Sequence, residues 1–283
     1  MAHYVIRIAR GATIAILFVL AAAAGTVSGL LFASAGDMPQ VSALDDYAPS
    51  TITQVYAKDG EVVGEFATQH RVVISYDQIS PLLKQAIIAS EDQHFESHIG
   101  LSIPRILATA VTDVLHRRRY GASTLTQQLA RNLFLTNEKT WTRKFKELVL
   151  TLEIEKRYTK REIFTLYCNH IPWGHGTYGA EAAARLYFGK SAKDVTLEEA
   201  ALLAGIVQLP ARQSPYVNPA AALRRRNRTL QLMADEGYIT QARADEAKKT
   251  PVVTAGRPST SGFADFFLDR EGLARLSSRK VER

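Results

Sequence analysis

Residues 91–100, which read EDQHFESHIG, are the stretch on which the fold and function of this chain depend most. They follow an apolar segment that begins with Ser80 and Pro81, an N-cap and a proline at the first helical position. This segment predicts a helix that runs to about Ser90. A carboxylate at the end of a buried helix faces the negative pole of the helix dipole and little water, and both make it a better proton acceptor. Glu91 is therefore a candidate general base, and the alternative is a polar helix end without chemistry.

Two histidines in the same stretch raise the alternative of a metal site. His94 and His98 are four residues apart and could share one face of a helix. A metalloprotease helix needs the order His-Glu-x-x-His, whereas Phe-Glu-Ser separates the two histidines here, and Gly100 leaves little room for a long helix. We therefore expect no metal ligand in this stretch and interpret His98 as a structural hydrogen bonder.

A second polar stretch, residues 121–132, reads GASTLTQQLARN. Thr124 followed three residues later by Gln127 is a capping box, which predicts that a helix begins here. Free N–H groups at a helix N-terminus bind phosphate well, and Arg131 lies on the same helical face as Gln127. A capped surface helix is the alternative, but it does not explain the whole cluster of hydroxyl, amide and cationic groups. The candidate phosphate-binding side chains are Ser123, Thr124, Gln127, Gln128, Arg131 and Asn132.

A third stretch, residues 143–147, reads RKFKE and lies on a predicted helix. Arg143 and Glu147 are four residues apart, so they could form a simple surface ion pair worth about 0.3–0.5 kcal/mol. Taken alone, this is a weak functional signal. The apolar face of the helix is predicted to consist of Trp141, Phe145, Leu148 and Leu152.

The rest of the pattern predicts a mainly α-helical chain with a small β element. Residues 51–56 alternate and are β-branched, Asp59-Gly60 is a strong turn signal, and residues 62–63 and 71–74 are candidate returning strands. From residue 79 onward the pattern stays helical. Further predicted features are a helix from Ser102 to Leu115, N-caps at Thr159, Thr196 and Asn218, a helix end at Gly237, and a loop at Gly174, Gly176 and Gly179 before a helix at 180–188.

The N-terminal segment predicts the cellular compartment. Residues 11–36 carry no charge and are long enough to cross a hydrocarbon core of roughly 30 Å as one helix. Arg7 and Arg10 precede them and acidic residues follow, which favours an N-terminus inside the cell and the rest of the chain outside the cytoplasmic membrane. A cleaved signal peptide is the alternative, since residues 33–35 read ASA, but its apolar core is usually only about 7–15 residues long. We therefore expect a retained anchor.

The net charge of the 283-residue chain, +7, suits an anionic partner: nucleic acid, an anionic membrane surface or a phosphorylated substrate. The single cysteine, Cys168, allows no internal disulfide, and no CxxC pair exists for structural zinc. Cys168 lies in an apolar stretch, so we expect a buried hydrophobic side chain rather than a nucleophile.

Together the three polar stretches resemble the signature motifs of the peptidoglycan glycosyltransferases. That family includes the monofunctional transglycosylases and the N-terminal domain of class A penicillin-binding proteins. Its pattern around the catalytic glutamate, E-D-x-x-F-x-x-H-x-G, is matched by residues 91–100, and its patterns G-x-S-T-x-T-Q-Q-L and R-K-x-x-E are matched by residues 121–129 and 143–147. The motifs keep the family's order over roughly residues 50–250, although Arg131 stands where lysine is frequent. Further matches follow at Tyr158, Lys160, Ile163, Tyr167, Asn169 and Arg225-Arg226-Asn227.

The resemblance implies a mainly α fold, a lysozyme-like helical transglycosylase domain with a membrane-proximal jaw, a small β hairpin and one N-terminal transmembrane helix. The expected organisation is an N-terminal cytoplasmic segment and transmembrane anchor at 1–36, a linker and β hairpin at 37–78, the glycosyltransferase domain at 79–250 and a C-terminal tail at 251–283.

The resemblance also implies the reaction. A growing glycan chain on a lipid pyrophosphate would be the donor, and the lipid-linked disaccharide-peptide, lipid II, would be the acceptor. Glu91 would take the proton from the acceptor's 4-hydroxyl group, with inversion and release of lipid pyrophosphate, while Glu147 would assist on the donor side. No cofactor is firmly implied, although a divalent cation such as Mg²⁺ at the pyrophosphate is left open. The implied substrate-binding side chains are Asp92, Phe95, His98, Ser123, Thr124, Gln127, Gln128, Arg131, Asn132 and Arg143.

The expected location is the bacterial cytoplasmic (inner) membrane, with a single span and the catalytic domain on the outer, periplasmic side. The expected partners are lipid II, the growing glycan-lipid pyrophosphate, membrane lipids and, as open candidates, other cell-wall synthesis proteins. Nucleic acid fits the charge but not the location. Two rival functions stay open: a lysozyme-like lytic enzyme, which would not need the cationic cluster, and a non-catalytic cell-wall assembly scaffold, which we would expect to lack Glu91 or Glu147.

Transpeptidation is expected to be absent. A penicillin-binding domain needs S-x-x-K and K-T-G motifs. The one S-x-x-K match, residues 277–280, lies at the extreme end of the sequence, and K-T-G is missing. A natural monofunctional enzyme and a truncated class A protein both fit this pattern.

Overall fold

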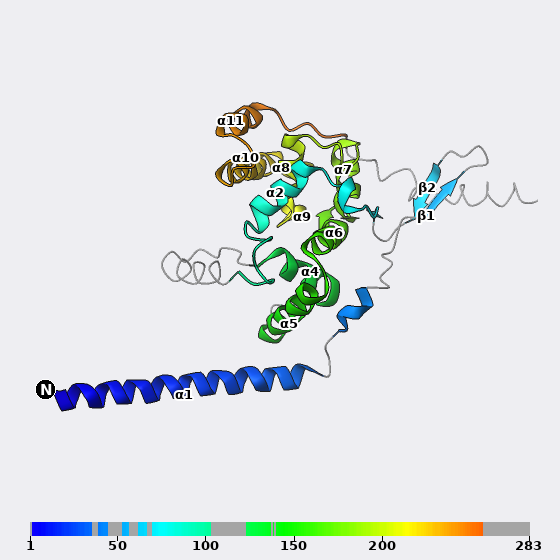
Figure 1. Ribbon diagram of the computed structural model, residues 1–283. Helices are drawn as coiled ribbons and strands as arrows, with labels where there is room; N and C mark the ends of the chain where they lie inside the picture. The colour runs from blue at the N-terminus through cyan, green and yellow to red at the C-terminus, as the bar shows by residue number, and fades with distance from the viewer. Residues whose placement is uncertain are drawn as a thin grey trace, which may run out of the picture.

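The computed structural model describes residues 2–35, 39–44, 53–56, 62–66, 70–102, 123–136, 138 and 140–256. Helices make up most of this part of the chain, as predicted, and the helices from residue 81 onward pack into one body (Figure 1). Two short 3-10 helices, Val41–Leu44 and Tyr76–Gln78, precede that body. The α-helices are α1 (Ala2–Ala35), α2 (Pro81–Glu91), α4 (Leu125–Phe134), α5 (Trp141–Arg157), α6 (Lys160–His170), α7 (Ala180–Phe188), α8 (Leu197–Ile206), α9 (Pro210–Gln213), α10 (Pro219–Asp235) and α11 (Gln241–Lys249).

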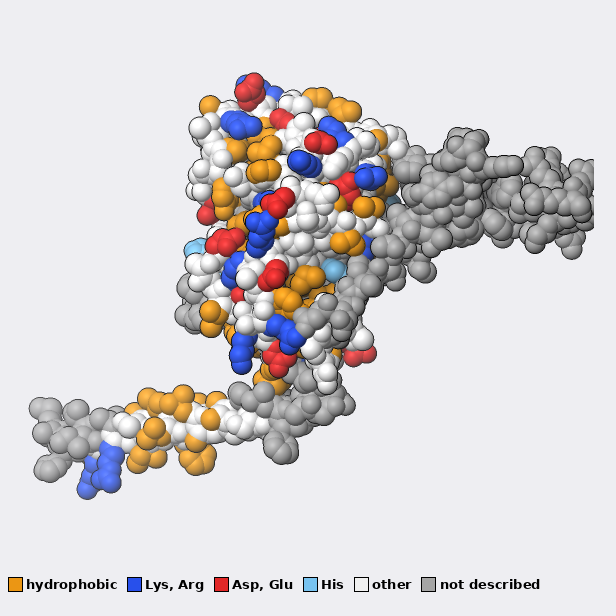
Figure 2. Space-filling view, turned by 45° about the vertical axis from the view of Figure 1, so that its right-hand side comes forward, with side chains coloured by type: hydrophobic (Ala, Val, Ile, Leu, Met, Phe, Trp, Pro, Cys, Tyr) orange, Lys and Arg blue, Asp and Glu red, His pale blue; other side chains and the backbone are white. Residues whose placement is uncertain are grey.

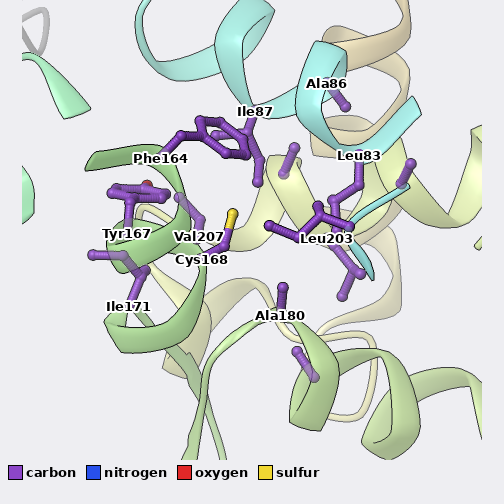
Figure 3. Close-up of a cluster of buried hydrophobic side chains, with 14 of the residues drawn as sticks. Leu83, Ala86, Ile87, Phe164, Tyr167, Cys168, Ile171, Ala180, Leu203 and Val207 are labelled. Carbon is purple, nitrogen blue, oxygen red and sulfur yellow. The ribbon is translucent and has the colours of Figure 1, made fainter. Parts of the chain in front are cut away.

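The core is built around α8, whose residues from Ala200 to Ile206 are all buried, and α2 and α10 pack directly against it. Figure 3 shows Leu83 of α2, Leu203 of α8 and Cys168 of α6 gathered in one cluster of buried side chains. Cys168 is fully buried, as predicted, and burial raises the pKa of its thiol. The cysteine therefore stays protonated and acts as a small hydrophobic side chain.

Helices α8 and α10 cross closely because Gly205 has no side chain. A Cβ atom at Gly205 would lie 3.0 Å from the carbonyl carbon of Arg225, tighter than nine in ten real Cβ contacts. At the same crossing, Nε of Arg225 donates a hydrogen bond to the carbonyl oxygen of Gly205 at 2.7 Å. The crossing therefore fixes the position of Arg225 against α8.

The predicted helix boundaries are largely confirmed. Ser80 begins α2 by accepting a hydrogen bond from the backbone N–H of Leu82 at 3.2 Å. Thr124, Thr159 and Thr196 form capping boxes at the starts of α4, α6 and α8. Asn218 caps α10, which ends at Asp235, just before Gly237 with a φ of 76°. The helix predicted from Ser102 to Leu115 cannot be compared, because residues 103–122 lie outside the described residues.

Two small sheets contain the strands, one predicted and one not. Strands β1 (Thr53–Tyr56) and β2 (Val62–Phe66) pair antiparallel, which confirms the hairpin, although its predicted turn lies outside the described residues. Residues 71–74 do not return to this hairpin. Instead β3 (His70–Arg71) pairs in parallel with β5 (Thr177–Tyr178), which pairs antiparallel with β4 (Pro172–Gly174). The predicted glycine-rich loop therefore contains a short β hairpin, formed by β4 and β5. The parallel partner of β5 is β3, which comes from roughly a hundred residues earlier in the chain.

Helix α5 buries a different face from the predicted one. Trp141 is 90% exposed and Leu152 is 43% exposed, so these two apolar side chains do not belong to the core. Apolar spacing alone misled the prediction, because the face that packs against α4 carries a buried carboxylate and a buried hydroxyl. A buried carboxylate on a packed helical face is costly unless it is paired, so it marks a position with a specific task. The buried residues of α5 are Glu147, Leu150, Thr151 and Ile154.

The N-terminal residues form the single helix α1, which contains most of the predicted anchor. Apolar side chains along it, from Ile14 to Leu20, are largely exposed, and Figure 2 shows them gathered beyond the basic side chains near one end. Within the ranges that the structure describes, however, no helix meets the combined length and apolarity needed to cross a membrane.

Candidate active site

Glu91 is the last residue of α2, and only 2% of its surface is exposed. It is buried because the helix packs Leu83, Ala86 and Ile87 into the core. Its Oε2 accepts a hydrogen bond from Nε2 of Gln128 at 2.9 Å. A hydrogen bond to the charged form of a carboxylate stabilises that form. The predicted position at the end of a buried helix is confirmed.

The loop after Glu91 is held by Asp92 and His98. Oδ2 of Asp92 accepts a hydrogen bond from the backbone N–H of Leu125 at 2.9 Å and lies 2.9 Å from Nε2 of His98. On the other side of the imidazole ring, Nδ1 accepts the backbone N–H of Gly100 at 2.9 Å. The proton of the neutral ring is therefore on Nε2 and is donated to Asp92. His98 is the structural hydrogen bonder that was predicted.

Burial changes the interpretation of Asp92 and Phe95. Asp92 is 1% exposed and Phe95 is fully buried, with its ring centroid 6.1 Å from that of Phe164. Both side chains face the protein interior, and the substrate contact that the resemblance implied for them stays a prediction. In the structure, the hydrogen bonds of Asp92 and His98 hold the segment that follows Glu91.

The N-terminus of α4 donates its hydrogen bonds within the protein. Oγ1 of Thr124 accepts the N–H of Gln127 at 3.2 Å, and Oε1 of Gln127 accepts the N–H of Thr124 at 3.3 Å. The N–H of Leu125 is taken by Asp92. The amides of Thr124, Leu125 and Gln127, which the sequence offered to phosphate, are therefore occupied within the protein.

Further along α4, the three predicted polar side chains have different surroundings. Gln128 lies between two partners, because its Nε2 donates to Glu91 and its Oε1 accepts the hydroxyl of Tyr167 at 3.3 Å. Asn132 is exposed and donates to the backbone oxygen of Gln128 at 2.8 Å. Arg131 is half-buried, and its charge acts on the Tyr167 hydroxyl. The structure thus brings Gln128 to Glu91 and leaves Asn132 and Arg131 more open.

Glu147 is fully buried between two cations. Its Oε2 accepts from Nη1 of Arg143 at 2.6 Å, and its Oε1 is bound by Nζ of Lys144. The side chain of Glu147 has no exposed surface, so the alternative of a simple surface ion pair is wrong. Two positive charges against one negative charge leave a local excess of one positive charge.

The two glutamates are linked through the first turns of α4. Glu91 is bonded to Gln128, while Lys144 connects Glu147 to the other side of the same helix end. Nζ of Lys144 lies 3.4 Å from both Oγ of Ser123 and Oε1 of Gln127. Helices α2, α4 and α5 therefore bring Glu91, Glu147 and the predicted polar side chains into one region.

Three further residues belong to this region but were not among the predicted site residues: Lys144, Tyr167 and Arg225. Burial lowers the pKa of the Arg225 guanidinium on α10, and the negative charge of Glu91 opposes that shift. Burial, followed by the charge of Glu91, raises the pKa of the Tyr167 hydroxyl well above its ordinary value. All three lie within matched motifs, and that was the available signal.

A family model described as Transglycosylase matches residues 59–234, which is more than half of the chain. The chain belongs to the transglycosylase family. Over 234 residues it is 40% identical to penicillin-binding protein 1A of Aquifex aeolicus, covering 82% of this chain and 32% of that protein. Over 230 residues it is 41% identical to penicillin-binding protein 1A of Vibrio cholerae, covering 81% of this chain and 28% of that protein. Penicillin-binding protein 2D of Bacillus subtilis is 42% identical over 235 residues, which cover 82% of this chain and 33% of that protein.

The chain thus spans about a third of the length of the curated relatives that it matches. The matched region contains all of the residues that build the site, from Glu91 on α2 to Arg225 on α10. The similarity therefore concerns the transglycosylase domain.

Proposed function

We propose that this chain is a peptidoglycan glycosyltransferase that polymerises lipid II into glycan strands, with inversion at the anomeric carbon and release of lipid pyrophosphate. The observation that carries the proposal is the pair of buried glutamates tied to the same end of α4 in different electrostatic settings. Glu91 accepts a hydrogen bond from the neutral amide of Gln128, whereas Glu147 is bound by two cations. One carboxylate suits proton transfer, and the other suits the organisation of positive charge.

Glu91 is the proposed base. The hydrogen bond from Gln128 favours the carboxylate form, and burial keeps competing water away from it. In the reaction, the proton of the acceptor's 4-hydroxyl group passes to Glu91 as that oxygen forms its bond to the donor's anomeric carbon. The bond from the anomeric carbon to the pyrophosphate oxygen breaks, and its electron pair leaves with the lipid pyrophosphate. A single displacement of this kind inverts the configuration.

The cations around Glu147 are the proposed binding site for the pyrophosphate. Arg143 and Lys144 exceed the charge of Glu147 by one positive charge, and Nε of Arg143 is buried without a hydrogen-bond partner among the described residues. Fixed donors and positive charges aimed at a leaving group stabilise the negative charge that develops on it. Glu147 would hold both cations in place rather than transfer a proton.

A lysozyme-like lytic enzyme is the main rival. Such an enzyme acts on a neutral glycan, and the excess positive charge beside Glu147 would then have no anionic group of the substrate to bind. The rival predicts that the chain acts on finished glycan strands, whereas the proposal predicts that it acts on lipid II. Purified full-length chain should convert labelled lipid II into long glycan strands on a gel and should release no soluble fragments from isolated sacculi. Release of fragments without polymerisation would refute the proposal in favour of the rival.

A divalent cation is proposed only as a companion of the substrate phosphates. Among the described residues, no group of three or more histidine, cysteine, aspartate or glutamate side chains is placed to hold a metal ion. Initial rates with and without a chelator, at fixed ionic strength, would test whether Mg²⁺ contributes.

We also propose that the chain works at the outer face of the bacterial cytoplasmic membrane, with residues 11–36 as a single-pass anchor. The support is the uncharged sequence of this segment, the two arginines before it and the exposed apolar side chains of α1. Membrane lipids would then be partners, and other cell-wall synthesis proteins are candidates. Protease added to spheroplasts should digest the domain and leave a short anchored fragment, whereas a mature protein released without the anchor would contradict this topology.

A further inference from the structure

The side chain of Gln128 has to be held in one orientation for Glu91 to keep its hydrogen bond. The amide has a donor end, Nε2, which lies 2.9 Å from Oε2 of Glu91, and an acceptor end, Oε1, which lies 3.3 Å from the hydroxyl of Tyr167. If the amide turned over, it would place one acceptor oxygen against another at Glu91. If the side chain turned away, Glu91 would lose this donor.

Tyr167 is built to hold the acceptor end of that amide. It lies on α6, is fully buried, and sits among Phe164, Cys168 and Ile171 in the core (Figure 3). Its ring therefore cannot follow a moving Gln128. Burial and the nearby Glu91 raise the pKa of its hydroxyl, so the group stays protonated and can donate throughout the working pH range.

We propose that Tyr167 is a positioning residue for the base: it acts on Glu91 through Gln128 and touches no substrate. The inference rests on the proposed role of Glu91. Helix α6 thereby joins α2 and α4 in one hydrogen-bonded chain, Tyr167 to Gln128 to Glu91. Helix α6 also packs against α4, α5 and α7, and among its described side chains the Tyr167 hydroxyl is the one that bonds to Gln128.

Tyr167→Phe removes that hydroxyl and keeps the ring that fills the core. We expect kcat for lipid II polymerisation to fall about fivefold to tenfold, the effect of losing one neutral hydrogen bond, while KM stays within about twofold. Because the Gln128 amide is then held at only one end, its hydrogen bond to the charged form of Glu91 weakens, and the acidic limb of the pH–rate profile should move to higher pH. The other charged groups nearby are Asp92 at the end of α2, Arg131 on α4 and Arg225 on α10, and all are unchanged in the variant.

Tyr187→Phe is the matched control. Tyr187 is also fully buried, and its hydroxyl donates to the backbone oxygen of Trp173 at 2.8 Å rather than to the site. This variant should lose stability to a similar degree and keep the wild-type kcat and pH profile. If both variants lower kcat equally, loss of a buried hydroxyl is sufficient to explain the effect and the positioning role is refuted.

A double-mutant cycle tests whether Tyr167 acts through Gln128. In the Gln128→Ala background, Tyr167→Phe should cause no further loss of kcat, whereas an independent packing role would lower kcat by the same factor in both backgrounds and overturn the proposal. A second readout needs no substrate: ¹³C NMR titration of the Glu91 carboxyl carbon, assigned with Glu91→Gln, should give a higher pKa in Tyr167→Phe than in wild type. An unchanged Glu91 titration in Tyr167→Phe would refute the positioning role, whatever the substrate is. If the titration shifts but the wild-type protein is inactive on lipid II, only the proposed function is refuted.

Discussion

Arg143→Ala separates a binding role of this residue from a structural one. In the folded protein, Nη1 of Arg143 donates to Glu147 at 2.6 Å, and Lys144 binds the same carboxylate. The variant therefore leaves the buried Glu147 paired with one cation and avoids the penalty of an orphaned buried charge. The loss of one charged hydrogen bond should lower the free energy of unfolding by at most about 1.5–3 kcal/mol, with Lys144 compensating for part of it.

Arg143→Ala should also lower the activity of the folded protein. A charged hydrogen bond to the pyrophosphate contributes about 1.5–3 kcal/mol, and about 1.4 kcal/mol corresponds to a factor of ten. We therefore expect kcat/KM for lipid II to fall by roughly 10- to 100-fold. The assay measures initial polymerisation rates across lipid II concentrations, the affinity of a phosphoglycolipid inhibitor and the melting temperature on the same preparation.

Arg161→Ala is the control for removing an arginine. Arg161 pairs with Asp77 at 2.5 Å, but both side chains are more than half exposed, so the pair should matter little to stability and not at all to the rate. If Arg143→Ala lowers the melting temperature while kcat/KM and inhibitor affinity stay within about twofold of wild type, Arg143 only pairs with Glu147 and its assignment to the pyrophosphate is wrong.

Two further predictions concern the framework of the site. Gly205→Ala places a Cβ atom 3.0 Å from the Arg225 carbonyl carbon, so it should destabilise the protein by about 1–3 kcal/mol and reduce kcat by shifting Arg225. Thermal melting and initial rates measure the two effects, and an unchanged melting temperature would contradict the close crossing. Burial lowers the pKa of His170 to about 4, below its ordinary value of 6.5, so stability should fall as pH drops from about 6.5 to about 4. His170→Gln should flatten that dependence in denaturant titrations at several pH values, and an equal slope in both proteins would contradict the assignment.

Local signals predicted helix starts well because each depends on a few adjacent residues. Ser80, Thr124 and Thr159 each cap the helix that the sequence placed after them. The same holds for Glu91, whose position at the end of a buried helix follows from the apolar residues before it. Helix caps depend on hydrogen bonds within one turn, which is why the sequence predicts them well.

Long-range features were predicted poorly. The pairing of β3 with β5 joins segments about a hundred residues apart, and no local pattern indicates it. The apolar face of α5 was wrong because Glu147 occupies the packed side, where a charge is tolerated only with the two cations that bind it. Tyr167 and Arg225 were missed as site residues because only the packing of α6 and α10 brings them to Glu91.

The most direct test of the proposed mechanism is Glu91→Gln, measured for rate and melting temperature on one preparation. Glutamine keeps the shape and can still accept the hydrogen bond from Gln128, but it cannot take up the acceptor's proton. Removal of a general base typically costs about 10²–10⁴-fold in rate, so polymerisation of lipid II should nearly vanish while the melting temperature persists.

Glu181→Gln is the matched control, because Glu181 is equally buried but lies on α7, away from the site. Its carboxylate binds Arg185 on the same helix and the backbone N–H of Ala192 after it. It should lower the melting temperature and leave the rate of the remaining folded protein intact. Polymerisation by Glu91→Gln within about tenfold of wild type, with or without a change in melting temperature, would contradict the assignment of Glu91 as the base.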